Sequence, residues 1–160
     1  MKPILYICFL IATVVTSCRV QEEVIQKEEI LLIKHGYTFG RCVGYCNKET
    51  TYSQAQVRHV QYNRDTLNNP PKISEKKILA EDFKALCTSV DLNAFLQLEE
   101  RIGCPDCADQ GAEYVEIITS KQTKRVTFEP GKPVPVLDSL LVKLRAGTMQ
   151  MERSKMTVDR

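Results

Sequence analysis

Two closely spaced cysteine pairs are the residues of this chain best suited to chemistry. Cys42 and Cys46 are separated by three residues, and Cys104 and Cys107 by two. Such pairs can close as two local disulfides, or their four thiolates can bind one zinc ion. A bridge between positions 42 and 46 needs a turn that brings the Cα atoms within about 7 Å, and Gly44 makes that turn feasible. We expect local pairing, 42 with 46 and 104 with 107, while crossed pairing stays open.

The second pair has the C-x-x-C spacing of thioredoxin-type redox sites. That chemistry needs the first cysteine at a helix N-terminus, where the backbone field lowers the pKa of the thiol. Residues 113–117, Glu-Tyr-Val-Glu-Ile, follow only a few positions later and have the pattern of a strand. Because the required helix is missing from the pattern, we interpret Cys104 and Cys107 as a structural disulfide.

The other titratable residues show no catalytic or metal-binding pattern. His35 and His59 are the only histidines, and neither has a carboxylate at a spacing that marks a partner. Asp106, Asp109 and Glu113 form an acidic segment whose spacing is not that of a calcium loop. No serine-centred elbow, phosphate loop or H-E-x-x-H motif occurs in the sequence. We therefore assign no catalytic residue, no metal ligand and no cofactor.

The N-terminus has the pattern of an export signal. Lys2 precedes an apolar run from Ile4 to Val15, which is shorter than the roughly 20 residues of a membrane-spanning helix. Residues 15–18, Val-Thr-Ser-Cys, resemble the lipobox of bacterial lipoproteins, in which the cysteine is acylated and becomes the new N-terminus. The resemblance implies lipid on Cys18 and a place in the bacterial cell envelope, with the outer membrane expected. Ordinary secretory cleavage is the alternative, and a retained membrane span is a third.

Export also bears on the cysteines, because an oxidising compartment favours sulfur pairing over free thiolates. Disulfides at Cys42, Cys46, Cys104 and Cys107 are therefore expected, with a zinc site on the same residues as the alternative. Cys87 is left over and falls on the apolar face of an expected helix, where it is interpreted as a small buried hydrophobic residue.

Composition argues against one class of partner. The formal net charge is only +2, basic residues are interspersed with acidic ones, and there is no tryptophan. A nucleic-acid-binding protein would be expected to carry a basic patch or stripe. The expected partners are a membrane, reached through the N-terminal lipid, and an unidentified envelope protein or ligand.

Polarity patterns predict the elements that position these residues. Strands are expected at residues 29–35, 48–52, 56–63, 72–78, 112–119 and 124–129. Loops are expected at 36–46 and 103–111, and helices over 79–98 and 134–146, with Gly147 as the stop signal. The order predicts an α+β fold, in which an antiparallel sheet of four to six strands carries two amphipathic helices on one face.

The domain organisation follows from these segments. We interpret residues 1–17 as a lipoprotein signal peptide and 18–27 as a tether. Residues 28–148 are then a single α+β domain, which is long enough to bury one core. Residues 149–160 are interpreted as a polar tail.

Two segments resemble a known group of proteins when taken together. Phe-Gly-Arg-Cys-Val-Gly-Tyr-Cys at 39–46 and Gly-Cys-Pro-Asp-Cys-Ala-Asp-Gln-Gly-Ala-Glu at 103–113 are similar to motifs of small uncharacterised exported lipoproteins from Bacteroidetes-type bacteria. The resemblance would cover roughly residues 28–146. It implies a place in the cell envelope, but the group has no established activity that could be carried over to this chain.

The function expected from the sequence is a lipid-anchored, non-catalytic binding or structural module. The alternative is a thiol- or zinc-dependent enzyme that uses the paired cysteines. Aromatic side chains often dominate the energy of a binding interface, and the first cysteine loop carries two of them. Phe39 and Tyr45 are therefore the candidate recognition residues.

Overall fold

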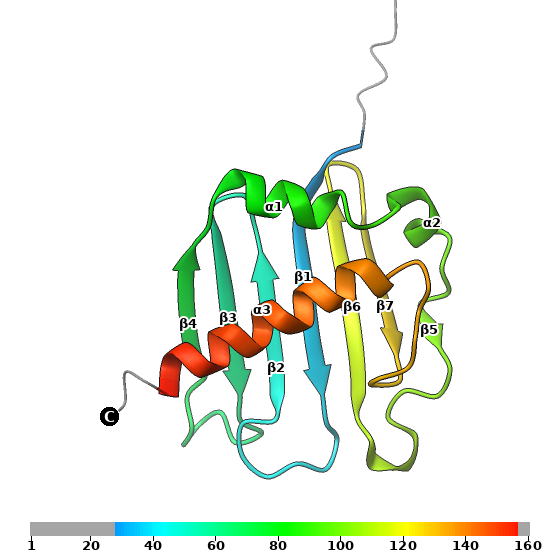
Figure 1. The fold of residues 1–160 in the computed structure, drawn as a ribbon. Helices are drawn as coiled ribbons and strands as arrows, with labels where there is room; N and C mark the ends of the chain where they lie inside the picture. The colour runs from blue at the N-terminus through cyan, green and yellow to red at the C-terminus, as the bar shows by residue number, and fades with distance from the viewer. Residues whose placement is uncertain (1–27, 157–160) are drawn as a thin grey trace, which may run out of the picture.

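The computed structural model describes residues 28–156, so the expectations for the signal peptide, for Cys18 and for residues 157–160 lie outside it. Within that range the chain forms one seven-stranded sheet and three α-helices (Figure 1). The strands are β1 (Ile30–Thr38), β2 (Asn47–Tyr52), β3 (Gln56–Tyr62), β4 (Lys72–Lys77), β5 (Arg101–Ile102), β6 (Ala112–Thr119) and β7 (Thr123–Phe128). The helices are α1 (Ala80–Cys87), α2 (Leu92–Leu96) and α3 (Asp138–Met156), with a short 3-10 turn at Cys107–Asp109.

The sheet has the order β4-β3-β2-β1-β6-β7-β5. Each neighbouring pair is antiparallel except β5 and β7, which run parallel. Helix α3 crosses one face of the sheet diagonally, and α1 lies over the same face near one end of the strands (Figure 1). The predicted α+β class with a largely antiparallel sheet is therefore confirmed, whereas the numbers of strands and helices are larger than expected.

The hydrophobic core lies between this face of the sheet and the helices. Alternation along β1 directs Ile33, His35 and Tyr37 to the helix-covered side, since successive strand residues point to opposite faces. Helix α3 contributes the buried leucines Leu140, Leu141 and Leu144, and Leu137 is buried just before the helix begins. Among residues 28–156, every buried core residue lies between positions 33 and 151, so residues 19–160 contain this whole core without the expected signal peptide.

Strand β1 continues through Gly36 to Thr38, where the sequence predicted a loop from residue 36. Gly36 pairs directly with Tyr114 of β6, and a Cβ at position 36 would collide with the Tyr114 ring. The glycine thus makes room for an aromatic side chain on the outer face of the sheet instead of starting a turn. As a result Tyr37 is a strand residue that faces the helices.

Helix α3 continues through Gly147, so the predicted stop at that residue is wrong. A Cβ at Gly147 would lie 2.5 Å from the hydroxyl oxygen of Tyr52, which donates a hydrogen bond to the carbonyl oxygen of Leu144. Gly147 therefore permits a close crossing of helix and sheet. Residues 149–156, expected in a polar tail, form the last turns of α3. None of the helices in residues 28–156 is both long and apolar enough to cross a membrane.

Candidate functional site

A fully buried carboxylate lies under α3 on the helix-covered face, near the end of strands β1 and β6. Glu113 of β6 pairs with Tyr37 of β1 across the sheet, and His35 lies one pleat away on the same face. Arg145 reaches the carboxylate from α3 above. The strand register and one turn of helix thus bring together residues that lie far apart in the sequence.

Both oxygens of Glu113 are occupied by donors. Oε1 accepts hydrogen bonds from His35 Nε2 at 2.8 Å, from the Tyr37 hydroxyl at 2.8 Å and from Arg145 Nε at 2.9 Å. Oε2 accepts a bond from Arg145 Nη2 at 2.7 Å. Burial alone would raise the pKa of Glu113, but the bonds from His35, Arg145 and Tyr37 outweigh it and lower the pKa to about 2. The carboxylate is therefore ionised at neutral pH.

Two neighbours of Glu113, Tyr37 and Arg145, are held in their protonated forms. Burial, followed by the negative charge of Glu113, raises the pKa of the Tyr37 hydroxyl far above its usual value. The hydrogen bonds to Glu113 raise the pKa of Arg145. Tyr37 and Arg145 are thus fixed donors, and neither is poised to give up a proton during a reaction.

A chain of hydrogen bonds leads from His35 to a second buried histidine. His35 Nδ1 lies 3.2 Å from the Thr148 hydroxyl, which lies 2.9 Å from the Thr50 hydroxyl. The Thr50 hydroxyl in turn lies 2.9 Å from His59 Nδ1. All four side chains are buried.

The ionised Glu113 sets the direction of this chain when both histidines are neutral. His35 must donate from Nε2, so its Nδ1 accepts the proton of Thr148. The Thr148 oxygen then accepts from Thr50, whose own oxygen accepts from Nδ1 of His59. The network therefore specifies opposite tautomers for the two histidines.

At the far end of this chain lies an ion pair on the edge of the buried network. Glu152 of α3 accepts a bond from Lys48 Nζ of β2 at 2.7 Å. Its Oε1 also lies 3.9 Å from His59 Nε2. The side chains of Lys48 and Glu152 are 30% and 28% exposed, so this pair borders on solvent.

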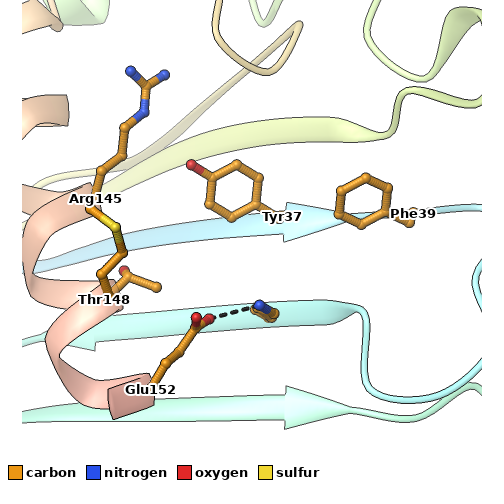
Figure 2. Close-up of a pocket in the computed structure, with 7 residues that line it drawn as sticks. Tyr37, Phe39, Arg145, Thr148 and Glu152 are labelled. Atoms are coloured by element: carbon orange, nitrogen blue, oxygen red, sulfur yellow. Dashed lines mark hydrogen bonds and ion pairs between the residues drawn. The ribbon is translucent and has the colours of Figure 1, made fainter.

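A pocket of about 350 Å³ opens above the network (Figure 2). In that view Tyr37 lies on β1 and Phe39 just beyond the end of this strand, while Arg145, Thr148 and Glu152 come from α3. The pocket is lined by Tyr37, Phe39, Lys48, Arg145, Thr148, Met149 and Glu152. It combines two aromatic rings and a thioether with two cations and one carboxylate.

The two buried titratable groups closest to the pocket, His35 and Glu113, are fully engaged with their neighbours. Both ring nitrogens of His35 are engaged, and Glu113 is surrounded by four hydrogen bonds. A general base needs an open hydrogen-bonding position toward its substrate. Neither of these two buried groups has one, so they orient Tyr37 and Arg145 at the pocket wall.

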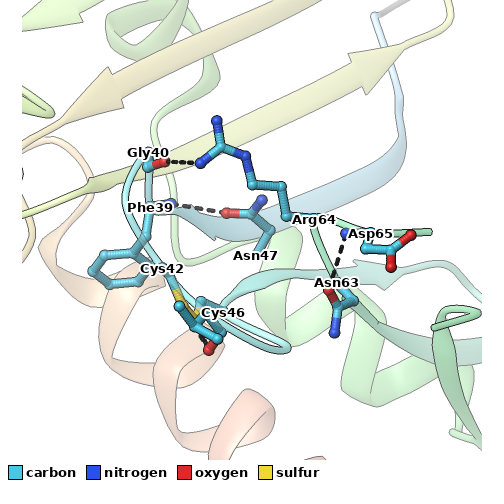
Figure 3. Close-up of a disulfide and its surroundings, with 9 residues drawn as sticks. Phe39, Gly40, Cys42, Cys46, Asn47, Asn63, Arg64 and Asp65 are labelled. Atoms are coloured by element: carbon cyan, nitrogen blue, oxygen red, sulfur yellow. Dashed lines mark hydrogen bonds between the residues drawn. A yellow bond between two sulfur atoms is a disulfide. The ribbon is translucent and has the colours of Figure 1, made fainter. Parts of the chain in front are cut away.

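The first disulfide lies beside this pocket, in the loop between β1 and β2 (Figure 3). Cys42 is joined to Cys46, as the local spacing predicted. The loop is held by a bond from the Phe39 amide to Asn47 Oδ1 at 2.8 Å and by one from Arg64 to the Gly40 carbonyl at 3.3 Å. These contacts fix the backbone that carries Phe39.

The second disulfide, Cys104–Cys107, belongs to a neighbouring loop at the same end of the sheet. Nη1 of Arg41 in the first loop lies 3.3 Å from Oδ2 of Asp109 in the second, which makes an ion pair between the loops. The four sulfurs nevertheless form two separate pairs. Within residues 28–156, no group of three or more His, Cys, Asp or Glu side chains is arranged to hold a metal ion.

The two candidate recognition residues have different surroundings. Phe39 is half-buried, lines the pocket and packs against Gly111, so its ring forms part of the pocket wall. Tyr45 lies in the disulfide loop, where its hydroxyl donates to the Pro70 carbonyl at 2.9 Å and its ring carries Lys72 Nζ at 4.2 Å. Their role in recognition stays a prediction.

Sequence reasoning missed the other residues of the pocket. Tyr37 was placed in a loop, and Arg145, Thr148 and Glu152 lay on both sides of the expected helix stop. Their spacing of three and four is a helical signal that would have been visible without that stop. Comparison of the chain with protein-family models and with curated proteins finds no match.

Proposed function

We propose that this chain is a lipid-anchored envelope protein whose domain is a non-catalytic binding module, and that the pocket beneath the C-terminal half of α3 is its binding site. The observation that carries the proposal is the saturated network around Glu113. A carboxylate that accepts four hydrogen bonds from both the sheet and the helix holds the pocket wall rigid before a ligand arrives. Preorganisation of this kind reduces the entropy lost on binding.

The disulfide loops support the same function. The Cys42–Cys46 bridge constrains the loop that presents Phe39, and the ion pair from Arg41 to Asp109 joins it to the second loop. Loops positioned by a rigid scaffold commonly carry binding residues. The resemblance of these loops to those of exported lipoproteins agrees with a module that works in the envelope.

The pocket is tested by nuclear magnetic resonance on the oxidised chain of residues 19–160. Small neutral, acidic and basic aromatic compounds are added, and we expect amide shifts concentrated at Tyr37, Phe39 and Met149. Met149→Trp should reduce these shifts, because the larger side chain fills the pocket. Val142→Trp is the matched control, since Val142 is exposed on the same helix and does not line the pocket. If no compound shifts these amides, the pocket is not the binding site.

The anchor is tested separately in a bacterial host. Cys18→Ser should release the protein from membranes or stall its processing, because stable attachment needs the acyl chains of the lipoprotein pathway. Cys8→Ser, within the expected signal, should leave fractionation unchanged. Unchanged membrane fractionation and unchanged mass of the Cys18→Ser protein would contradict a lipid at this residue.

A further inference from the structure

We infer that the pocket beneath α3 binds an organic carboxylate that carries an aromatic or similarly apolar body. This inference rests on the proposed function and names the chemical class of its ligand. It follows from which hydrogen-bonding groups of the pocket are already satisfied and which still face the cavity.

The pocket offers more donors than acceptors. The bonds from Arg145 to Glu113 use two of the five N–H groups of a guanidinium, and the Arg145 side chain is 33% exposed. Lys48 has three N–H groups, and Glu152 accepts one of them. A ligand that supplies acceptors therefore suits these two cations.

The negative charges of the site are less available to a ligand. Glu113 is completely buried and holds four hydrogen bonds, so it cannot receive a further donor from the cavity. Glu152 is the one carboxylate among the lining residues. A cationic ligand would have to compete with Lys48 for Glu152 and would be repelled by Arg145. Electrostatics thus favours an anion.

The rest of the wall suits an apolar body. Phe39 and Tyr37 present rings (Figure 2), and Met149 of α3 contributes a thioether to the lining. Aromatic rings and thioethers make favourable contacts with a third aromatic group. A cavity of about 350 Å³ is at the lower end of the range for small-molecule sites, which suits a ligand with one ring.

The ligand class is tested with three probes that share one body. 3-Phenylpropionate, 3-phenylpropanamide and 3-phenylpropylamine share the phenylethyl body and carry an anionic, a neutral and a cationic head group. Binding to residues 19–160 is followed by amide shifts at Tyr37, Phe39 and Met149. We expect the carboxylate to bind at least about fivefold more tightly than the amide, and the amine to bind most weakly. Acetate, which lacks the ring, should bind much more weakly than 3-phenylpropionate.

Two variants test the electrostatic argument, because their effects should have opposite signs. Lys48→Gln should weaken 3-phenylpropionate binding about threefold to fivefold, the range for a partly exposed charge pair. Glu152→Gln should strengthen it, since it removes a competing acceptor and a repulsive charge. A purely structural role of the pair would make both variants weaken binding. Arg58→Gln and Glu75→Gln, an exposed pair outside the pocket, are the matched controls and should change nothing.

The source of the carboxylate is tested with acetyl-Gly-Phe and its C-terminal amide. A preference of the pocket for the free acid would identify a peptide C-terminus as a ligand, and binding of 3-phenylpropionate alone would identify a free organic acid. Either result supports the carboxylate class. If 3-phenylpropanamide or 3-phenylpropylamine binds as tightly as 3-phenylpropionate or more tightly, the carboxylate class is overturned, while the pocket remains a binding site. Failure of every probe would overturn both the ligand class and the proposed location of the site.

Discussion

Arg145 of α3 and Glu113 of β6 form a two-bond fork, with Nε 2.9 Å from Oε1 and Nη2 2.7 Å from Oε2. The Glu113 side chain is wholly buried, whereas the Arg145 side chain is about one-third exposed. The fork therefore fastens the helix to the sheet and neutralises a charge that could not otherwise stay ionised in the core. It also fixes one wall of the pocket.

Removal of Arg145 should be strongly destabilising. In Arg145→Met the buried carboxylate loses its cation, and breaking such a pair lowers the free energy of unfolding by about 3 kcal/mol. Urea denaturation measures the change. The double variant Arg145→Met with Glu113→Gln should be more stable than Arg145→Met alone. Arg58→Met, which breaks the exposed pair with Glu75, should change stability by less than about 1 kcal/mol, and an equal loss in both would contradict the special role of the fork.

Glu113 should also make stability depend on acidity. Its pKa in the folded chain is about 2, below the ordinary value of 4.5, so its contribution is fully present above about pH 4.5 and is lost as the pH falls toward 2. Denaturation curves of the parent between pH 2 and 7 should therefore show a steep loss in this interval. In the double variant with Arg145→Met and Glu113→Gln, the free energy of unfolding should change less steeply with pH. An unchanged slope would show that Glu113 does not bind a proton on unfolding in that range.

The buried chain of hydrogen bonds should fix the two histidine tautomers. Long-range ¹H–¹⁵N spectra at a pH where both rings are neutral should show hydrogen on Nε2 of His35 and on Nδ1 of His59. Thr50→Val should release the His59 tautomer but leave that of His35, which Glu113 holds directly. The variant should also lose about 1–3 kcal/mol of stability, because buried partners lose a hydrogen bond. Thr50→Ser keeps the hydroxyl and is the control. Hydrogen on Nδ1 of neutral His35 would contradict the proposed direction of the hydrogen-bond chain from His59 to Glu113.

Much of the sheet could be predicted because its signals are local. The strands β2, β3, β6 and β7 alternate in polarity and are joined by short turns, so their bounds differ from the expected ones by at most one residue. The strand β5 was missed because two residues cannot show a period and its parallel partner β7 lies more than twenty positions away. Gly36 was misinterpreted because the sequence does not reveal that Tyr114 lies opposite it.

The candidate site was predicted in small part. Phe39 was predicted as a recognition residue because it is an aromatic residue of the first cysteine loop, and the structure places it in the pocket wall. The network around Glu113 could not be found from spacing, since His35 is 78 positions away and Arg145 is 32. Only the strand register and the helix crossing bring such residues together, and both depend on the complete fold.

The two disulfides should contribute modestly to stability. Each closes a very short loop, so each should add less than the roughly 3 kcal/mol expected for a 15-residue loop. Peptide mapping without reduction should find 42–46 and 104–107. Thiol titration of residues 19–160 should give one thiol before reduction, from Cys87, and five afterwards. Five thiols together with bound zinc in protein exported from its native host would support the thiol- or zinc-dependent alternative instead.

Gly147 should tolerate no side chain while Tyr52 keeps its hydroxyl. Alanine inside a helix is normally favoured over glycine by about 1 kcal/mol, so Gly147→Ala would stabilise an unobstructed helix. Here a Cβ would lie 2.5 Å from the Tyr52 hydroxyl oxygen and 3.4 Å from two of its ring carbons. Burial raises the pKa of Tyr52 to about 12, so this hydroxyl stays protonated and bonded to the Leu144 carbonyl.

We expect Gly147→Ala to lower the free energy of unfolding by about 1–3 kcal/mol, the range for overpacking. Tyr52→Phe removes the obstructing oxygen, so Gly147→Ala should be less harmful in that background, and a double-mutant cycle measures the difference. Ala146→Gly, at the neighbouring helical position, should show the ordinary preference for alanine. If Gly147→Ala stabilises the parent protein, then α3 does not cross the sheet at this close distance, and the pocket wall that depends on the crossing would have to be reconsidered.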